Sequence, residues 1–413
     1  MKLQKFDNWR IQMKINKNLA WISALLLSFL LMGCNQDLPD KLYDPDADKG
    51  ATPVLTSIIP DGKPLAGVGK LTVTGENFSP VPEENYLYFS GQRATILSAS
   101  STQLYVIAPD VVGDSIVVKA AVFRVELFSN ELIYELIPAV IEYGKIENPG
   151  EETQQGYALA VDNAENVFVQ TDLKKIQKIA LNGTTTNFAT TSYVAAKSMK
   201  FGPGGLLYAS APAGRVRKIV QYAADGTESL FATFPATPED FDFDAAGDIL
   251  AAVDMDIYRI KPDKSKAVIG SLPAVVKSVK FYNGVLYCLQ KADGSGQQKV
   301  WTVSPQESSL DNLTEIFDSG TSDVLAGASL NAMVVTENGD LVFGTNHVDN
   351  GIFTVSASGE VASLYASLIA AEITSLSWGN STILYALRDK DGTTKVLRVD
   401  MDTVKSATYE GRQ

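Results

Sequence analysis

Histidine and cysteine are scarce in this sequence. It contains one histidine, His347, and two cysteines, Cys34 and Cys288. A single histidine cannot supply a multi-histidine metal site, and two cysteines, one of them directly after an N-terminal leader, make no disulfide framework. A G-x-S-x-G nucleophile motif is also absent. We therefore expect no metal, no cofactor and no catalytic residues, and we expect Cys288 to be a small buried core residue.

Positive charge is also in short supply. The 413 residues carry 35 Lys and Arg against 48 Asp and Glu, a net charge of −13. Such a surface repels phosphate backbones and anionic lipids. The sequence therefore predicts no nucleic-acid partner.

Only one apolar run stands out, "LAWISALLLSFLL", and it is too short to span a bilayer well. A leader with several basic residues precedes it, which is typical of a signal peptide. The "LMGC" that follows resembles the bacterial lipobox, and this resemblance implies that residues 1–33 are removed and that Cys34 is acylated. A plain secretory signal or a short membrane anchor is the alternative.

Residues 34–52 are acidic, contain proline and are poor in apolar residues, which predicts a disordered tether. Acidic residues directly after a lipidated cysteine resemble the surface-export signals of Bacteroidota lipoproteins; an ordinary solvated linker is the alternative. The resemblance implies an outer-membrane lipoprotein exposed at the cell surface, held to the membrane through its lipid only.

Residues 53–137 alternate apolar and polar positions between turn residues, a pattern that predicts a small β-sandwich. "TSIIPDGKPLAGVGKLTVTGENF" resembles the opening of an IPT/TIG domain, and "YFSGQRA" and "QLYVIAPD" resemble its later strands. The resemblance implies an immunoglobulin-like fold and no chemistry of its own. We expect Gly75 and Asn77 to serve a turn that needs positive φ and Phe78 to pack beneath it.

A strand–turn–strand phrase recurs six times in residues 138–413, as in "FDFDAAGDILAAVD" and "VVTENGDLVFGTNH". Each unit continues into a third strand, and most into a fourth. Apolar residues two apart mark one face of each first strand. Because a four-stranded blade cannot bury both faces alone, the repetition predicts a six-bladed β-propeller, in which each blade stacks on two neighbours. The fourth strand of the last blade is open: "AVIEYGKIE" (139–147) and "KSATYEG" are both candidates.

The repeats resemble NHL repeats, in which a basic residue often occupies the third strand. Lys178, Lys218, Arg259 and Arg398 continue that feature, whereas blades four and five depart from it. The resemblance implies a propeller with a binding role as often as an enzymatic one. Most aromatic residues fall at core positions of the repeat, among them Trp378, Tyr208 and Tyr385. Trp301 follows a long loop and is a candidate exposed ring for stacking on a sugar.

The alternate face of each first strand should line the central channel. It carries charge in three consecutive blades: Lys200, then Asp240 and Asp242, then Lys280. A salt-bridge cluster that fills the channel is one interpretation, since buried charges are costly unless paired. A polar pocket for a small ligand is the other.

The loops after the second strands are polar and unequal in length, and they should gather at one mouth of the channel. We expect Asp240 near this mouth, with Asp254, Asn346, His347 and Arg388 on its rim. Six-bladed calcium lactonases would be the nearest enzymatic propellers, and Asp254, Asn346 and Asp389 could imitate their ligands, although their spacing matches no motif.

These features favour a non-catalytic surface protein that captures an oligosaccharide, or another small polar ligand, for an uptake system. Its expected partner is an outer-membrane transporter complex. An envelope scaffold for protein–protein contacts and a calcium-dependent hydrolase are the alternatives.

Overall fold

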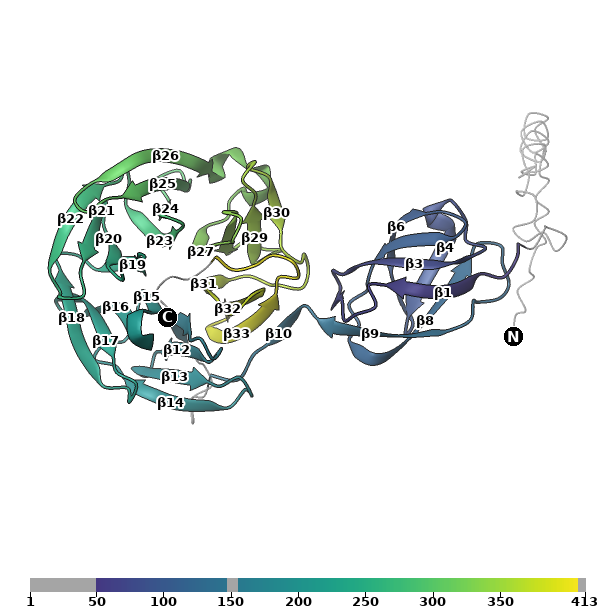
Figure 1. Cartoon of the computed structure of the whole chain (residues 1–413), viewed down its shortest axis with the longest axis horizontal. Coiled ribbons are helices and arrows are strands. Elements are labelled where there is room, and N and C mark those ends of the chain that lie inside the picture. The colour runs from purple at the N-terminus through teal and green to yellow at the C-terminus, as the bar shows by residue number, and fades with distance from the viewer. Residues whose placement is uncertain (1–49, 147–154, 408–413) are drawn as a thin grey trace, which may run out of the picture. The chain divides into compact units, whose positions relative to one another are not determined.

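The computed structural model describes residues 50–146 and 155–407, so the predicted signal peptide, Cys34 and nearly all of the tether lie outside the described residues. The described residues form only β-strands and short 3-10 turns, the strands grouped into eight sheets. No helix in this part of the chain is long and apolar enough to cross a membrane. Figure 1 shows a β-sandwich and a ring of six blades.

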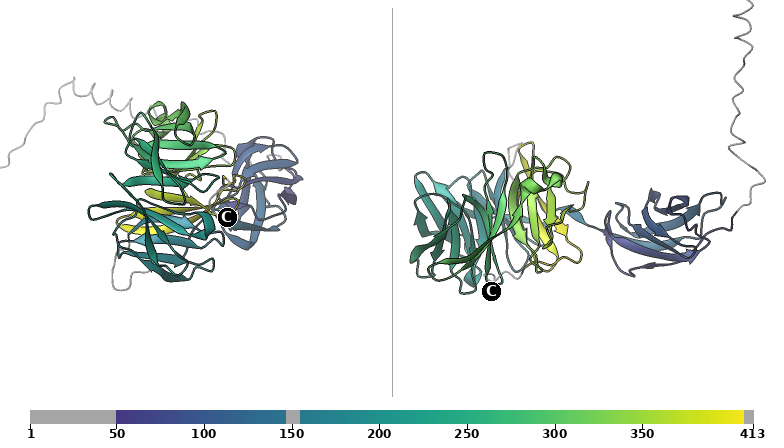
Figure 2. Two further views of the ribbon diagram at one scale, coloured as in Figure 1. Left: turned by 60° about the vertical axis from the view of Figure 1, so that its left-hand side comes forward. Right: turned by 90° about the horizontal axis from the view of Figure 1, so that it is seen from above.

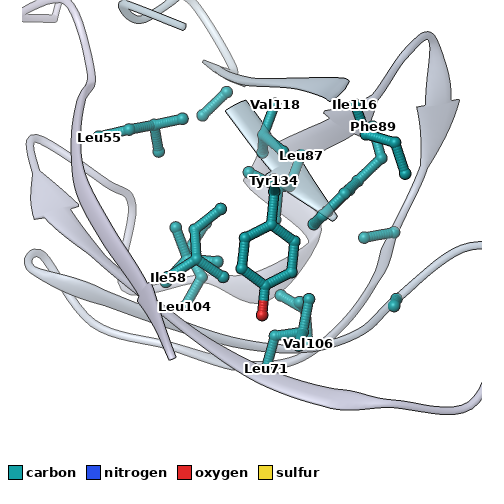
Figure 3. Packing of buried hydrophobic residues seen from close by; sticks show 14 of the residues in the cluster. Leu55, Ile58, Leu71, Leu87, Phe89, Leu104, Val106, Ile116, Val118 and Tyr134 are labelled. Atoms are coloured by element: carbon teal, nitrogen blue, oxygen red, sulfur yellow. The ribbon is translucent and has the colours of Figure 1, made fainter. Parts of the chain in front are cut away.

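The sandwich packs two sheets around one apolar core. The first sheet contains β1 (Val54–Ile59), β3 (Lys70–Glu76), β7 (Gln103–Ile107) and β6 (Thr95–Ala99) in that order. The second contains β2 (Leu65–Ala66), β9 (Leu132–Pro138), β8 (Gly113–Val122), β4 (Asn85–Phe89) and β5 (Gln92–Arg93), with the turn η1 (Pro82–Glu84) before β4. Figure 3 shows side chains from both sheets meeting around Tyr134.

In the turn after β3, the predicted burial of Phe78 and positive φ of Asn77 are confirmed, whereas the predicted positive φ of Gly75 is wrong. Phe78 is buried, and Asn77 has a positive φ of 62°. Gly75 is needed for a different reason: a Cβ there would lie 2.0 Å from the Val54 carbonyl oxygen and 2.5 Å from the Phe78 ring. Close approach, and not positive φ, therefore requires glycine at this position.

Blades one to three each contain four consecutive antiparallel strands, numbered outward from the channel (Figure 1). Blade one has β11 (Gly156–Val161), β12 (Val167–Thr171), β13 (Lys175–Ile179) and β14 (Thr185–Thr190). Blade two has β15 (Ser198–Phe201), β16 (Leu207–Ala213), β17 (Val216–Tyr222) and β18 (Glu228–Phe234), with η2 (Pro203–Gly205) between its first two strands. Blade three has β19 (Pro238–Phe243), β20 (Ile249–Val253), β21 (Asp256–Ile260) and β22 (Lys266–Ser271).

Blades four and five repeat this order, and blade six takes its outer strand from the other end of the domain. Blade four has β23 (Val276–Tyr282), β24 (Val285–Gln290), β25 (Lys299–Pro305) and β26 (Leu310–Asp318), followed by η3 (Ser319–Thr321) and η4 (Asp323–Leu325). Blade five has β27 (Leu330–Val335), β28 (Leu341–Thr345), β29 (Ile352–Val355) and β30 (Val361–Ser363). Blade six has β31 (Ile373–Trp378), β32 (Ile383–Lys390), β33 (Thr393–Asp400) and β10 (Val140–Glu142).

The strand β10 therefore closes the ring, which decides between the two candidate segments. Val140, Ile141 and Glu142 pair with β33, and the Glu142 carboxylate binds Arg388 at 2.9 Å and Lys395 at 2.7 Å. Residues 404–407 instead cross towards blade five, where the Ala407 N–H donates to the Val335 carbonyl.

Apolar packing between neighbouring blades holds the ring together. Six buried clusters each draw side chains from two adjacent blades, and one of them joins blade six to blade one through Tyr385, Leu387, Leu159 and Val161. Trp378, Tyr208 and Tyr385 are buried in these clusters, as predicted from their register. Cys288 is buried as well, and burial raises the pKa of its thiol. Figure 2 shows the same ring turned, with the strands running between its two faces.

The closing strand can be tested with one substitution and its control. The register places the Ile141 N–H towards β33, and proline at this position removes that donor. We expect Ile141→Pro to lower the free energy of unfolding by roughly 1–3 kcal/mol, whereas Ile141→Thr keeps the N–H and stays close to the parent. In a chain that begins at residue 35, both remaining tryptophans, Trp301 and Trp378, lie in the propeller. Their fluorescence in a urea titration reports its unfolding, and equal midpoints for the two variants would show that β10 is dispensable.

Candidate functional site

The centre of the propeller holds the charged cluster that the sequence predicted. Lys200 on β15, Asp240 and Asp242 on β19, and Lys280 on β23 come from three consecutive inner strands and are buried or nearly so. Alternation along each strand turns these side chains to the channel while their neighbours pack between blades. The cluster is electrically neutral when all four groups are ionised.

Asp240 is the hub of this cluster. Both of its carboxylate oxygens are surrounded by donors from its own strand and from the two neighbouring inner strands. The donors are Ser198 Oγ at 2.5 Å, the Phe241 N–H at 2.9 Å and Lys200 Nζ at 3.1 Å on Oδ1, and Ser278 Oγ at 2.7 Å, the Val279 N–H at 3.0 Å and Lys280 Nζ at 2.6 Å on Oδ2. The carboxylate thereby satisfies a backbone N–H on the channel edge of β23, which no strand pairs.

Asp242 makes a second bridge of the same kind and has a different electrostatic environment. Its oxygens accept from the N–H groups of Phe243 at 3.0 Å and Phe281 at 2.8 Å. Burial raises the pKa of Asp242, and the two lysines reverse that rise only in part. Burial would also raise the pKa of Asp240, but Lys200 and Lys280 outweigh it and hold that pKa well below its usual range. Burial lowers the pKa of Lys280 to about 8 against the attraction of Asp240.

Two small cavities flank the cluster, one at each mouth of the channel. The polar mouth lies where the inner strands begin; it has a volume of about 60 Å³ and includes Asp240 in its wall. The apolar mouth lies where these strands end; it has a volume of about 50 Å³ and is lined by Asp242, Trp378, Phe201, Tyr282 and others. Lys200 and Lys280 line both. Each cavity has room for a few water molecules or one small polar group, well below the 300 Å³ or more of ordinary ligand pockets.

A ring of side chains around the polar mouth was not predicted from the sequence. The pairing of first and second strands slips by one residue at the start of β11, β19, β23, β27 and β31. Each slip is a β-bulge, which leaves one residue unpaired and re-aims its side chain. In β15 the residue directly before the strand takes the equivalent place. We call these six residues the bulge ring: Tyr157, Lys197, Glu239, Lys277, Asn331 and Thr374.

Five members of the bulge ring line the polar mouth together with the residue that follows each of them. Glu239 accepts from Lys291 at 2.8 Å and lies 3.8 Å from Lys197. Lys277 Nζ donates to Asn331 Oδ1 at 3.3 Å, and the Asn331 amide donates to Glu372 at 2.9 Å. Ammonium, carboxylate, amide and hydroxyl groups thus surround one opening. The only sequence signal for them is their position one residue before the channel-facing positions.

The loop residues predicted for the rim lie apart from this opening. Asp254 is exposed in the turn between β20 and β21, and Asn346 and His347 follow β28. The Asn346 side chain accepts from the Ser329 N–H at 2.7 Å, and the His347 ring contacts Phe353 edge-on at 5.2 Å. None of the three lines either channel cavity.

Arg388 and Trp301 occupy structural positions. Arg388 lies on β32 and binds Glu142 of the closing strand at 2.9 Å, with 18% of its side chain exposed. Trp301 lies inside β25, half-buried against the apolar cluster between blades three and four, so its ring is not presented from the preceding loop. A ligand role for either residue stays a prediction.

Among the described residues, no group of three or more His, Cys, Asp or Glu side chains is arranged to hold a metal ion. Asp254, Asn346 and Asp389, the residues that could imitate a calcium site, come from blades three, five and six.

Comparison with known proteins identifies the first domain and supports the fold of the second. Residues 53–132 match the model of the IPT/TIG domain. No curated protein sequence matches this chain.

Several solved structures share the architecture at low sequence identity. An auxiliary nutrient binding protein from Bacteroides thetaiotaomicron VPI-5482 has a TM-score of 0.52 and 10% identity over 85% of this chain and 98% of its own. A putative phosphatase from the same organism has a TM-score of 0.53 and 13% identity over 86% and 98%. A putative gluconolactonase has a TM-score of 0.50 and 11% identity over 62% and 92%. At these identities the likeness establishes the fold alone.

The two channel aspartates should respond differently to loss of charge. The depressed pKa of Asp240 means that its charge stabilises the fold above the unfolded pKa of about 4, and that this stability is lost as pH falls through the folded value. The raised pKa of Asp242 means that its charge costs stability once the pH exceeds the unfolded value.

We therefore expect Asp240→Asn, which removes the carboxylate that contacts both buried ammonium groups, to lower the free energy of unfolding by about 3–5 kcal/mol at pH 7. Asp242→Asn should lower the free energy of unfolding by clearly less, because burial already disfavours the ionised form of the Asp242 carboxylate. Urea unfolding followed by tryptophan fluorescence measures both. Equal losses would contradict the assignment of Asp240 as the hub.

Proposed function

We propose that this protein is a non-catalytic, lipid-anchored surface protein that captures an oligosaccharide at the polar mouth of its propeller for an uptake system. The bulge ring carries this proposal. It places ammonium, carboxylate, amide and hydroxyl groups around one opening, which is the set of donors and acceptors that a sugar hydroxyl array requires.

The rigidity of the ring supports a binding role. The inner strands that present the bulge ring are joined through Asp240, Asp242 and buried apolar clusters. Gln298 makes a second polar link, between blades four and five. Its side-chain N–H group donates to the Gln290 carbonyl at 3.2 Å and to the Leu330 carbonyl at 3.0 Å. Groups held in this way lose little conformational freedom when a ligand binds.

The fold is compatible with nutrient capture, since one structure of similar architecture is described as an auxiliary nutrient binding protein. Hydrolase-type names also occur among the similar structures. A calcium-dependent hydrolase would need several oxygen ligands around one cation, and none of the three candidate ligands of this chain, Asp254, Asn346 and Asp389, lines either channel cavity. An outer-membrane location, exposure at the cell surface and a transporter partner belong to the same proposal.

The binding role is tested by calorimetry of the chain from residue 35 with a panel of neutral and acidic oligosaccharides. We expect at least one micromolar ligand, and we expect Asn331→Ala to weaken it about tenfold, since a lost polar contact costs about 1.4 kcal/mol. Asn182→Ala, in an exposed turn between the third and fourth strands of blade one, is the matched control. A ligand whose affinity is the same in both variants would place the site elsewhere, and capture of proteins in place of glycans would favour the scaffold alternative.

The anchor is tested separately. Cys34→Ala should remove the acylation site and move the protein from the membrane fraction to the soluble fraction. Cys288→Ala, which alters the buried thiol of β24, should leave the fractionation unchanged. A Cys34→Ala protein that stays in the membrane with unaltered mass would disprove the lipobox interpretation.

A further inference from the structure

The polar mouth is positively charged in a protein that is acidic as a whole. Lys197, Lys277 and Lys291 lie at or beside the opening, against Glu239 and Glu372, so three positive groups meet two negative ones. The four charges of the cluster beneath them cancel. The chain carries a net charge of −13, so a local excess of positive charge at this opening is contrary to the general composition.

Lys277 carries that excess. The two deeper lysines share Asp240, and Glu239 binds Lys291 and Lys197. Lys277, in contrast, forms no ion pair with any carboxylate among the described residues, and the acceptor of its Nζ is the neutral Asn331 Oδ1 at 3.3 Å. Its side chain is half-buried in the wall of the mouth, and burial lowers its pKa.

Glu239 and Glu372 act on Lys277 only at longer range. A partly buried cation that contacts no carboxylate is costly, and an anion that reaches it recovers part of that cost. The Ser375 hydroxyl in the same wall offers a further donor, whereas the Ser278 and Thr374 hydroxyls already donate to Asp240 and to the Leu387 carbonyl. The bulge at β23 is what turns Lys277 into this wall next to Ser278.

The size of the mouth limits what can reach Lys277. A cavity of about 60 Å³ accepts a single carboxylate or sulfate group but no sugar ring, since ordinary ligand pockets begin near 300 Å³. The remainder of a ligand would have to lie outside, across the loops that surround the opening.

We propose that the polar mouth is a subsite for an anionic substituent, in which Lys277 binds the carboxylate or sulfate group of an acidic oligosaccharide. This inference rests on the proposed function and gives the chemical class of its ligand. Lys277 supplies the charge, Lys197 adds a second ammonium at the rim, and the Ser375 hydroxyl completes the contacts to the anion.

Calorimetry with paired ligands tests this subsite. The probes are a galacturonate tetramer, its methyl-esterified form and a sulfated oligosaccharide of equal length. We expect a charged form to bind, and Lys277→Met to weaken it about 10- to 100-fold, the value of a charge-assisted hydrogen bond. Lys70→Met, an exposed lysine of β3 in the sandwich domain, removes the same charge and should change nothing. Equal affinity for the charged and esterified forms, unaltered by Lys277→Met, would overturn the subsite while leaving glycan capture intact.

A second measurement tests the anion subsite independently of oligosaccharide binding. Reductive dimethylation with ¹³C keeps each lysine charged and gives it an NMR signal, and Lys277→Met identifies the signal of Lys277. We expect galacturonate or inorganic sulfate to shift that signal, and galactose to leave it in place. If neither anion shifts it, the subsite is disproved. If an anion shifts it and no oligosaccharide binds, the subsite stands and the glycan-capture function fails.

Discussion

The carboxylate of Asp240 is the interaction on which the channel depends. The innermost strand of every blade presents an unpaired edge to the channel, and a buried unpaired N–H is costly. Asp240 accepts the Val279 N–H on such an edge, and it also neutralises Lys200 and Lys280. One side chain therefore joins blades two, three and four, whose strands belong to three separate sheets.

The same inner strands produce the opening above this layer. Bulges at the start of four of them turn Glu239, Lys277, Asn331 and Thr374 into the wall of the polar mouth. Bulges are common at rims and next to functional sites because they re-aim side chains without changing the sheet. The charged cluster joins the inner strands of blades two to four, and the bulge ring places polar groups around the opening, where we propose that the ligand binds.

The blades and the channel charges could be predicted because apolar residues two apart define a strand face in each repeat. The buried Trp378 and Tyr385 follow from that register, and so do the channel positions of Asp240 and Lys280. The bulge ring could not be predicted, because no residue type in the sequence signals where a bulge shifts the register by one residue. Strict alternation along the strand would turn Lys277 and Glu239 away from the channel. The sequence alone places Arg388 in a polar loop, because its ion-pair partner Glu142 lies 246 positions away in the chain and only the fold brings the two together.

A crystal structure of the chain with bound galacturonate tests the central claim most directly, since it places the ligand without assuming which residues hold it. Our account predicts the carboxylate within hydrogen-bonding distance of Lys277 Nζ, with the sugar ring outside the polar mouth. An ordered sugar at the apolar mouth beside Trp378, along the outer strands of the blades or on the sandwich domain would contradict it.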